Sequence, residues 1–358
     1  MSLKTVIYNY QKDSSFIKKD RLIISTNFKV LNYRFSTSKK ILTPLLLVHH
    51  FVFLLYHWFK YDIIVSHIAG YHTFIPSLLS FLKLKKHIII LHGTDSNIIP
   101  EINYGNLQKP YLKWFTKFSI KHATILLPVS LSLINNQSMY YTGQNARFGL
   151  KSIIHDFNTK FEVIHNGLDC DLFRIIHLDR DPSSFMTVAL DLHLEKNVKL
   201  KGIDLIIQLA KEFPEFYFTI IGSEKIFGYN DSLYNVKLIG KVSQKELIQH
   251  YNSHKFYFQL SISESFGLSL CESMLCGCIP IVSNVGMMCD IIEDEGYILE
   301  KRDFNELKKL ITQILSYPKI ISQQNLRNLI MNKYAENIRK EKLINVISSY
   351  LTNNKSPL

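Results

Sequence analysis

The chain alternates short β-branched and aromatic runs with stretches whose apolar residues recur every three or four positions. Because strands repeat with period 2 and helices with period 3.6, this alternation predicts parallel α/β layers. The pattern breaks at Asn166-Gly167, a turn signal followed by a polar stretch, and then resumes. The predicted strands are Thr5–Tyr8, Asp62–Ser66, His87–Leu91, Ile125–Val129, Phe185–Leu192, Phe216–Ile221, Val236–Ile239, Phe256–Leu260 and Ile279–Val282.

The break predicts an α/β chain of two Rossmann-like, doubly wound domains that face a central cleft. We place the N-terminal domain at residues 1–168, a linker at 169–184 and the C-terminal domain at 185–335. For residues 336–358 we expect a C-terminal helix that packs back on the N-terminal domain. The predicted helices are Ile75–Leu84, Ile203–Phe213, Gln244–Asn252, Gly267–Leu275 and the chain from Asp303 onward.

Composition agrees with two globular domains, since 358 residues with 47% hydrophobic and 20% charged side chains suffice for two cores. Residues 1–170 hold 20 Lys/Arg against 8 Asp/Glu, whereas residues 171–358 hold 22 of each. A basic half suits an anionic membrane, a phosphate-bearing acceptor, nucleic acid, or simply a solubilising surface. The sequence has no helix-turn-helix, RNP-like or zinc-finger signature, so we expect no nucleic-acid partner.

The segment between Lys40 and Lys60 has 19 residues without a formal charge, close to the ~20 that a membrane span needs. Pro44 interrupts it, and His50 and His57 are seven apart, which puts them on one helix face. The segment therefore predicts a core helix or a helix at a membrane interface rather than a span.

The five cysteines are odd in number and form no CxxC pair, which predicts reduced thiols and no zinc site. The first residues contain no apolar stretch with a cleavage site, so no signal peptide is expected. Both observations favour a cytoplasmic protein.

Two carboxylates, Glu264 and Glu272, stand eight residues apart around the predicted helix start at Gly267. A helix start offers unpaired N–H groups and the positive end of the helix dipole, which suit a diphosphate or sugar hydroxyls. The same spacing also fits a helix cap at Glu264 with Glu272 at the surface.

This stretch resembles the E-x7-E motif of retaining glycosyltransferase family 4, which has the two-domain GT-B fold. The resemblance covers roughly residues 62–315, and the order of its motifs is specific. The other matching segments are His92-Gly93-Thr94-Asp95, Val163–Phe173, Lys201-Gly202-Ile203-Asp204, Leu238-Ile239-Gly240 with Glu246-Leu247, Cys276–Val282 and Asn284-Val285-Gly286.

The resemblance implies a donor site in the C-terminal domain and an acceptor site in the N-terminal domain. Glu264 would hold hydroxyls of the donor sugar, Glu272 the ribose, and Lys201 the diphosphate leaving group. His92 would contact the sugar, although a structural role also fits it, as a solvated surface role fits Lys201. The residues implied at the nucleotide and sugar are completed by Val242 near the base and by the backbone of Phe266, Gly267 and Leu268.

The sequence departs from the family pattern in two places. No Arg precedes Lys201, so Lys196 is the substitute phosphate ligand, without the bidentate fork of arginine. The first glycine is Gly70, so Asn9–Lys19 must replace the family's glycine-rich loop if anything does.

These features together predict a hexosyltransferase-type enzyme that moves a sugar from a nucleoside-diphosphate sugar to a hydroxyl, with retention of configuration. We expect no metal and no cofactor, a lipid-linked or polysaccharide acceptor, and peripheral contact with an anionic membrane at the inner face of the cell membrane. The alternatives are a nucleotide-sugar epimerase of the same fold and a non-enzymatic basic binding or scaffold protein.

Overall fold

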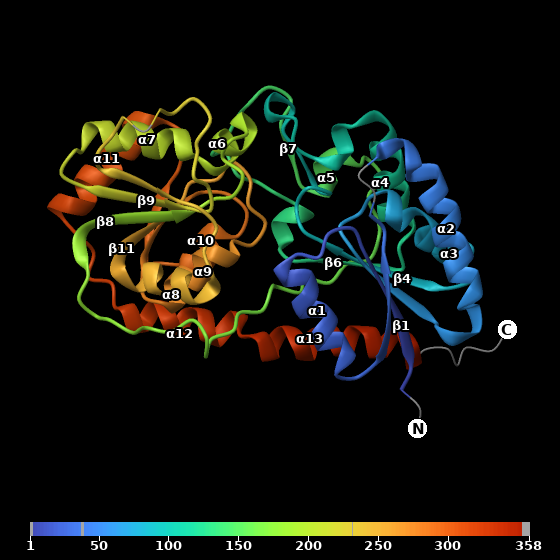
Figure 1. Ribbon diagram of the computed structural model, residues 1–358. Helices are drawn as coiled ribbons and strands as arrows, with labels where there is room; N and C mark the ends of the chain where they lie inside the picture. Colours follow the sequence, from blue (N-terminus) through green and yellow to red (C-terminus); the bar gives the residue numbers. More distant parts are fainter. Residues whose placement is uncertain (1–2, 37–38, 231, 353–358) are drawn as a thin grey trace. The chain divides into compact units, whose positions relative to one another are not determined.

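The computed structural model describes residues 3–36, 39–230 and 232–352. The chain forms two compact units, each with its own parallel sheet (Figure 1). This confirms the predicted α/β class with two parallel-sheet domains. The first unit comprises Met1–Asn136, Asn145–Asn166 and Asn337–Leu358, and the second Gln137–Gln144 and Gly167–Glu336.

The first unit is built on a five-stranded parallel sheet in the order β2-β1-β3-β4-β6. Its central strand is buried along its whole length, as expected for a parallel sheet covered on both faces. The edge strand β2 was not predicted, because its exposed polar positions hide the apolar run. The strands are β1 (Thr5–Tyr10), β2 (Lys29–Arg34), β3 (Ile63–His67), β4 (Lys86–Leu91) and β6 (Ile125–Pro128), with an antiparallel pair β5 (Asn97–Ile98) and β7 (Arg147–Phe148).

The last helix of the chain, α13, belongs to this first unit. Its Arg339 forms a buried ion pair with Asp20 of α1, with Nη2 and Oδ2 2.5 Å apart. Arg339 also donates to the carbonyls of Ile164 and His165, so one side chain joins three separate segments. The helices of the unit are α1 (Ser15–Ser25), α2 (Thr43–Tyr56), α3 (Phe74–Phe81), α4 (Pro110–His122), α5 (Leu150–Ile153) and α13 (Glu336–Thr352).

The uncharged segment after Lys40 forms α2. Its buried side chains are His50 and Leu54, and its other apolar side chains lie largely at the surface. His50 faces inward because its ring stacks on Tyr33, at 4.2 Å between centroids. The helix thus adds Leu54 to the core cluster of the unit, with Phe53 packed against that cluster, and leaves many of its other apolar side chains exposed. Across residues 3–36, 39–230 and 232–352, none of the helices combines the length and hydrophobicity of a membrane span.

The second unit has a six-stranded parallel sheet in the order β10-β9-β8-β11-β12-β13. Strand β8 runs from Asp181 to Val188 instead of from Phe185 to Leu192. Its polar first residues resemble a linker in the sequence, yet Asp181 pairs in register with His254. The strands are β8 (Asp181–Val188), β9 (Tyr217–Ile221), β10 (Val236–Ile239), β11 (His254–Gln259), β12 (Ile279–Ser283) and β13 (Tyr297–Leu299).

The core of this sheet is aromatic, with the ring of Phe185 stacked on Phe218, Phe256 and Phe258 at 4.9 to 5.4 Å between centroids. These rings provide a stiff base for the loops that follow the strands. The helices of the unit are α6 (Glu195–Lys201), α7 (Ile203–Glu212), α8 (Gln244–Ser253), α9 (Leu268–Leu275), α10 (Met288–Ile292), α11 (Phe304–Ser316) and α12 (Gln323–Tyr334).

Candidate functional site

Glu264 lies in the loop between β11 and α9, at the carboxyl end of the central strands. Its Oε2 accepts hydrogen bonds from Lys201 Nζ at 2.7 Å and Gln259 Nε2 at 3.2 Å, with Ser261 Oγ at 3.5 Å. The carboxylate is therefore held by a cation and two polar side chains that all approach the same oxygen. Ligands bind at this edge of open α/β sheets, so the cluster is the candidate site of the unit.

The position of Lys201 follows from the backbone that surrounds it. Lys201 ends α6, and the next residue, Gly202, is left-handed with φ +67°. A Cβ at Gly202 would lie 2.2 Å from the carbonyl oxygen of Leu260, so only glycine allows this approach. The backbone at Lys201 and Gly202 is thus packed against the end of β11, and the ammonium of Lys201 reaches Glu264.

The Lys201–Glu264 pair is half-buried, with side-chain exposures of 29% and 18%. An ammonium has three N–H donors, so Lys201 keeps further donors for an anion after it has bound Glu264. Lys199, which is close by in sequence, instead pairs with Glu195 on the exposed side of α6, at 2.7 Å. Lys201 therefore contacts the Glu264 carboxylate, whereas Lys199 is paired on the exposed side of α6.

Glu264 is fixed from a second side by Gly286, in the loop after β12. A Cβ at Gly286 would lie 1.8 Å from the carbonyl oxygen of Glu264, and Gly286 has φ +58°. The Asn-Val-Gly segment therefore packs directly against the main chain of the carboxylate loop. The family resemblance includes this segment as a motif, but the sequence alone contains no physical reason for it.

Helix α9 begins at Leu268 with Gly267, in the left-handed conformation, as its N-cap residue. No side chain caps this helix, so the interpretation of Glu264 as a cap is wrong. The backbone N–H of Cys271 donates to the carbonyl of Gly267, so the N–H groups of the first turn, before Cys271, have no acceptor within the helix. The ring of Phe266 is buried and packs against the ring of Tyr334. At this position the backbone, and not the ring, is the part that a ligand could contact.

Glu272 occupies a different place, one turn into α9, and is partly buried. The hydroxyl of Tyr251 donates to its Oε2 at 3.4 Å. Burial raises the pKa of Tyr251 well above its usual value, so this hydroxyl keeps its proton and acts as a donor. The structure therefore gives the two carboxylates separate partners.

The remaining predicted residues are more loosely placed. Val242 is partly buried in the loop between β10 and α8, at the same edge of the sheet. Lys196 is exposed on α6 and takes part in none of the ion pairs found among the described residues. His92 belongs to the first unit, where it follows β4 and lies against Phe16 at 4.4 Å between ring centroids.

The sequence reading missed Gln259 and Ser261, because a strand-end glutamine and a loop serine carry no motif. Gln259 is 3% exposed, and its amide links Glu264 to Ser269 of α9 through Nε2 and Oε1. Its Nε2 also donates to Ser261 Oγ at 2.9 Å. Because the Gln259 amide donates through Nε2 and accepts through Oε1, it fixes which neighbouring groups donate and which accept hydrogen bonds.

The sequence analysis placed residues 137–144 in the N-terminal domain. In the structure they belong to the second unit, although residues of the first unit precede and follow them in the chain. Tyr140 is 3% exposed, and its hydroxyl donates to the carbonyl of Leu260 at 3.4 Å. Its own carbonyl accepts from the backbone N–H of Arg302, whose guanidinium pairs with Asp204 at 2.6 Å. This short segment thus supports the loop that leads to Glu264.

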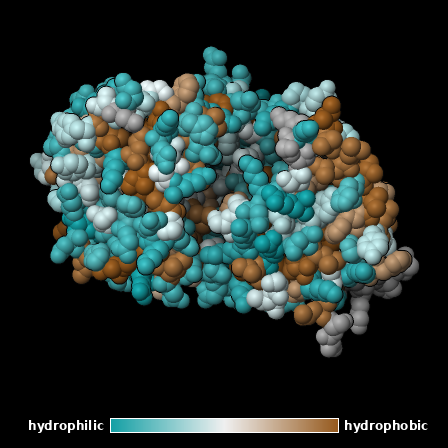
Figure 2. All heavy atoms as spheres, in the orientation of Figure 1, coloured by the Kyte–Doolittle hydropathy of each residue, from teal (hydrophilic) through white to brown (hydrophobic). Residues whose placement is uncertain are grey.

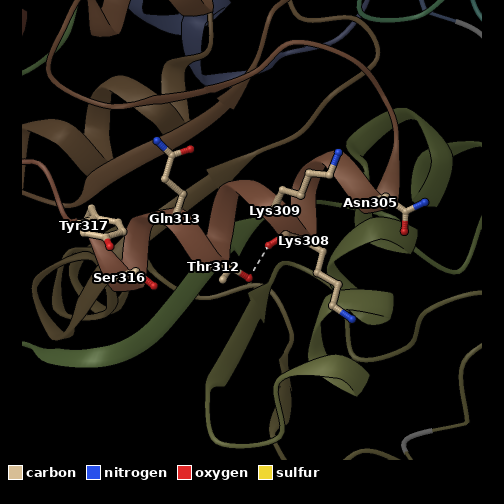
Figure 3. A pocket seen from close by; sticks show the side chains of 7 residues that line it. All are labelled: Asn305, Lys308, Lys309, Thr312, Gln313, Ser316 and Tyr317. Carbon is tan, nitrogen blue, oxygen red and sulfur yellow. Dashed lines mark hydrogen bonds between the residues drawn. The ribbon is translucent and has the colours of Figure 1, made fainter.

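A hollow of about 730 Å³ lies along α11, away from this network (Figure 3). Its lining side chains all come from α11 and the residue that follows it. Lys308 pairs with Glu212 and Lys309 with Glu306, so both of its cations already have carboxylate partners. A single helix cannot enclose a ligand, and the hollow is not the candidate site.

All five cysteines are free thiols. Burial raises the pKa of Cys276 and of Cys278 to about 12, which keeps them protonated. Within the described part of the chain, no three His, Cys, Asp or Glu side chains gather as metal ligands would.

Comparisons with known proteins bear on the fold and on the second unit. Residues 190–336, which contain Lys201, Glu264 and Glu272, match the family model "Glycosyl transferases group 1". An uncharacterized glycosyltransferase of Methanocaldococcus jannaschii is 26% identical over 263 residues, which are 71% of this chain and 66% of that protein. The matched part thus falls short of two thirds of that relative's length.

Solved structures share the fold. Sucrose-phosphate synthase from Thermosynechococcus elongatus superposes with a TM-score of 0.72 at 14% identity, over 97% of this chain and 99% of that one. Anabaena HepE in complex with UDP and glucose superposes with a TM-score of 0.65 at 15% identity, over 97% and 100%. The chain therefore has the GT-B fold, its residues 190–336 are similar to the group 1 glycosyl transferases, and these likenesses support a transferase enzyme.

Proposed function

We propose that this protein transfers a sugar from a nucleoside-diphosphate sugar to a hydroxyl acceptor, with retention of configuration as in glycosyltransferase family 4. The observation that carries the proposal is the Lys201–Glu264 pair beside the uncapped start of α9. A carboxylate that can accept from sugar hydroxyls, an ammonium and free backbone N–H groups are what a sugar joined to a diphosphate requires.

In the proposed reaction the bond between the sugar and the diphosphate breaks, and negative charge builds on the departing phosphate. Lys201 stabilises that charge, helped by the first turn of α9. Glu264 accepts hydrogen bonds from the donor sugar, and Glu272 from the ribose. Lys196 acts as the second phosphate ligand, and Val242 borders the base. Because the ammonium and the helix end supply positive charge, the reaction needs no metal.

The first donor to test is a UDP-sugar, since HepE of the same fold is described in complex with UDP and glucose. The decisive measurement is thermal stabilisation by a panel of nucleoside diphosphates and their sugars, in EDTA, with Glu272→Ala in parallel. A ligand at 100 times its dissociation constant adds about 2.7 kcal/mol. One nucleotide that stabilises the protein, and stabilises the variant less, supports the donor site. No response to any nucleotide would overturn it in favour of a scaffold.

Donor turnover distinguishes transfer from epimerisation. Incubation of the stabilising donor alone gives an isomerised sugar nucleotide if the protein is an epimerase of this fold. A transferase instead releases nucleoside diphosphate and forms product only when a hydroxyl acceptor is added.

We further propose that the acceptor is lipid-linked or a polysaccharide, and that the protein works at the inner face of the cell membrane. The specific observation is the outer surface of α2, where apolar side chains gather along the edge of the first unit (Figure 2). Leu45, Val48 and Val52 are 56 to 66% exposed, and Phe59 beyond the helix is 99% exposed. Leu45, Val48 and Val52 are spaced by three and four residues, so they form one outward stripe on α2.

Charge favours a lipid surface as the occupant of this stripe. Lys60 and Lys83 are exposed beside apolar side chains of the same unit, and residues 1–170 have twelve more cations than anions. An apolar stripe on a unit with excess positive charge suits the boundary between headgroups and acyl chains of anionic lipids. Binding to anionic vesicles that weakens with salt supports this contact, and equal binding to neutral vesicles contradicts it.

A further inference from the structure

Residues 137–144 hold two loops of the second unit through two side-chain hydroxyls. Ser138 Oγ donates to the carbonyl of Asn284, in the loop after β12. The hydroxyl of Tyr140 donates to the carbonyl of Leu260 at 3.4 Å, at the start of the loop after β11. Strands β11 and β12 are paired neighbours, so the two loops leave the sheet side by side. One short segment therefore fastens both of them.

The position of Tyr140 is itself set by the second unit. Its side chain is buried, and its carbonyl accepts from the backbone N–H of Arg302 at 2.9 Å. The guanidinium of Arg302 is paired with Asp204 of α7, so this support continues into the helix that follows Gly202. Burial raises the pKa of the Tyr140 hydroxyl, which therefore keeps its proton and acts as a donor. The hydroxyl is thus a donor in a fixed place.

Leu260 connects that hydroxyl to the lysine side of the candidate site. The carbonyl that accepts from the hydroxyl is also the atom that a Cβ at Gly202 would approach to 2.2 Å. Two residues after Leu260, the backbone N–H of Ile262 donates to the carbonyl of Leu200 at 2.8 Å. These two contacts lie on either side of Lys201 in the chain. A shift of Leu260 therefore moves the backbone that presents the ammonium.

Asn284 connects Ser138 to the carboxylate side of the candidate site. Its backbone N–H donates to the carbonyl of Leu299 at 3.0 Å, which ties the loop to the end of β13. Two residues further on, Gly286 lies directly against the main chain of Glu264. The Ser138 hydroxyl therefore holds the loop two residues before the contact that fixes the carboxylate.

We propose that Ser138 and Tyr140 are positioning residues for the donor site. Their hydroxyls keep the loops after β11 and β12 at the spacing that the Lys201–Glu264 pair requires, and they act through these loops without touching the ligand. The inference deepens the proposed function and rests on it for the identity of the ligand, a sugar joined to a diphosphate. Both residues lie outside 190–336, so the match to the glycosyl transferase family does not contain them.

Two matched pairs of substitutions separate positioning from general stability. Ser138→Ala with Tyr140→Phe removes both hydroxyls and keeps the ring and the backbone, so the fold is preserved. Ser322→Ala with Tyr297→Phe is the control pair, because it removes the same two groups elsewhere in the second unit. The Tyr297 hydroxyl accepts from a backbone N–H in the connection after α11, and the Ser322 hydroxyl caps α12.

The first test uses the ligand-free protein, so it does not depend on the proposed activity. Hydrogen exchange followed by NMR reports the opening of the backbone amides of Ile262 and Asn284, one in each loop and both hydrogen-bonded. We expect both amides to exchange roughly tenfold faster when the two hydroxyls are removed, the value of about one hydrogen bond. The amide of Phe218 in β9 is the internal reference and should not change. Unchanged loop amides, or the same acceleration in the control pair, would overturn the proposal.

The second test measures binding of a sugar nucleotide by calorimetry, with UDP-glucose as the first probe. We expect loss of the two hydroxyls to weaken binding roughly tenfold in the parent, and to have little further effect in the Glu264→Gln background, because residues that act through one another are not additive. The control pair should bind as the parent does.

Equal weakening in both backgrounds would mean that the hydroxyls act on stability alone, and would overturn the positioning of Glu264. If the parent binds no sugar nucleotide, the proposed function fails and the role at a donor site falls with it. The exchange rates then still decide whether residues 137–144 hold the two loops.

Discussion

Gly286 packs against the main chain of Glu264 so closely that any side chain at position 286 would collide with the carbonyl oxygen of the carboxylate residue. The contact joins two loops that follow neighbouring strands, β11 and β12. It makes the position of Glu264 depend on a residue 22 positions later in the chain.

The first prediction concerns this contact. Gly286→Ala should abolish stabilisation by the donor nucleotide, because the Glu264 loop must move to admit a methyl group. Gly228→Ala is the control, since Gly228 is also left-handed, at φ +72°, but has open space where a Cβ would lie. That variant should lose only about 1 kcal/mol to backbone strain and keep the nucleotide response. Thermal melts with and without nucleotide measure both effects.

The second prediction concerns Lys201. Lys201→Met should lower kcat by roughly 10²- to 10³-fold, the typical effect of removing a group that stabilises charge in the transition state. Lys199→Met removes a lysine of the same short helix whose partner is an exposed glutamate, and should leave kcat nearly unchanged. Steady-state kinetics on both variants decides the matter, and equal losses would argue against a direct role for Lys201.

The third prediction concerns acid sensitivity. Burial lowers the pKa of His50 to about 3 and that of His72 to about 4. An unfolded histidine titrates near 6.5, so between that pH and the lowered pKa the unfolded chain binds more protons than the folded one. The contribution of each histidine is complete above pH 6.5 and is lost as the pH falls. At pH 5 each should cost about 2 kcal/mol of stability.

His50→Phe isolates this effect. Both ring nitrogens of His50 are buried without a hydrogen-bond partner, and the ring stacks on Tyr33, so a phenyl ring replaces it without losing a bond. The variant should lose less stability than the parent between pH 7 and pH 5. His155→Gln, at a fully exposed side chain, should follow the parent. Denaturation midpoints across this pH range test the difference, and parallel curves for all three proteins would contradict it.

The fourth prediction concerns the outer stripe of α2. Replacing Leu45, Val48 and Phe59 by Ser should reduce binding to anionic vesicles at least tenfold, since about 1.5 kcal/mol or more is lost with each large apolar side chain that no longer enters the bilayer. Ile320→Ser, at a fully exposed apolar residue of the second unit, is the control and should bind as the parent does. Vesicle sedimentation at two salt concentrations gives the comparison.

The sequence predicts the sheets and the main motifs well because both depend on local information. Buried parallel strands read as apolar runs, and Lys201 and Glu264 sit in short segments with a recognisable order. The role of Gly286 could not be foreseen, because its collision is with a carbonyl oxygen that only folding brings near. Gln259 was missed for a similar reason, since its partners converge from a strand, a loop and a helix.

The orientation of α2 shows the limit of hydrophobic patterning. His50 is buried although histidine is a polar residue, because a neutral imidazole stacks on an aromatic ring almost as an apolar group does. Tyr33, which lies on strand β2, stacks on His50 and so determines that this side chain faces inward. No pattern within the helix itself contains that information.

The segment of residues 137–144 has a consequence for anyone who wishes to divide or recombine this protein. A single cut between residues 166 and 167 would leave the second unit without Tyr140 and the first unit without α13. A chimaera that exchanges the second unit with that of a relative must therefore carry residues 137–144 and 167–336 together and retain the native end of the chain. Exchange of the second unit is therefore a two-segment exchange with four junctions in the chain.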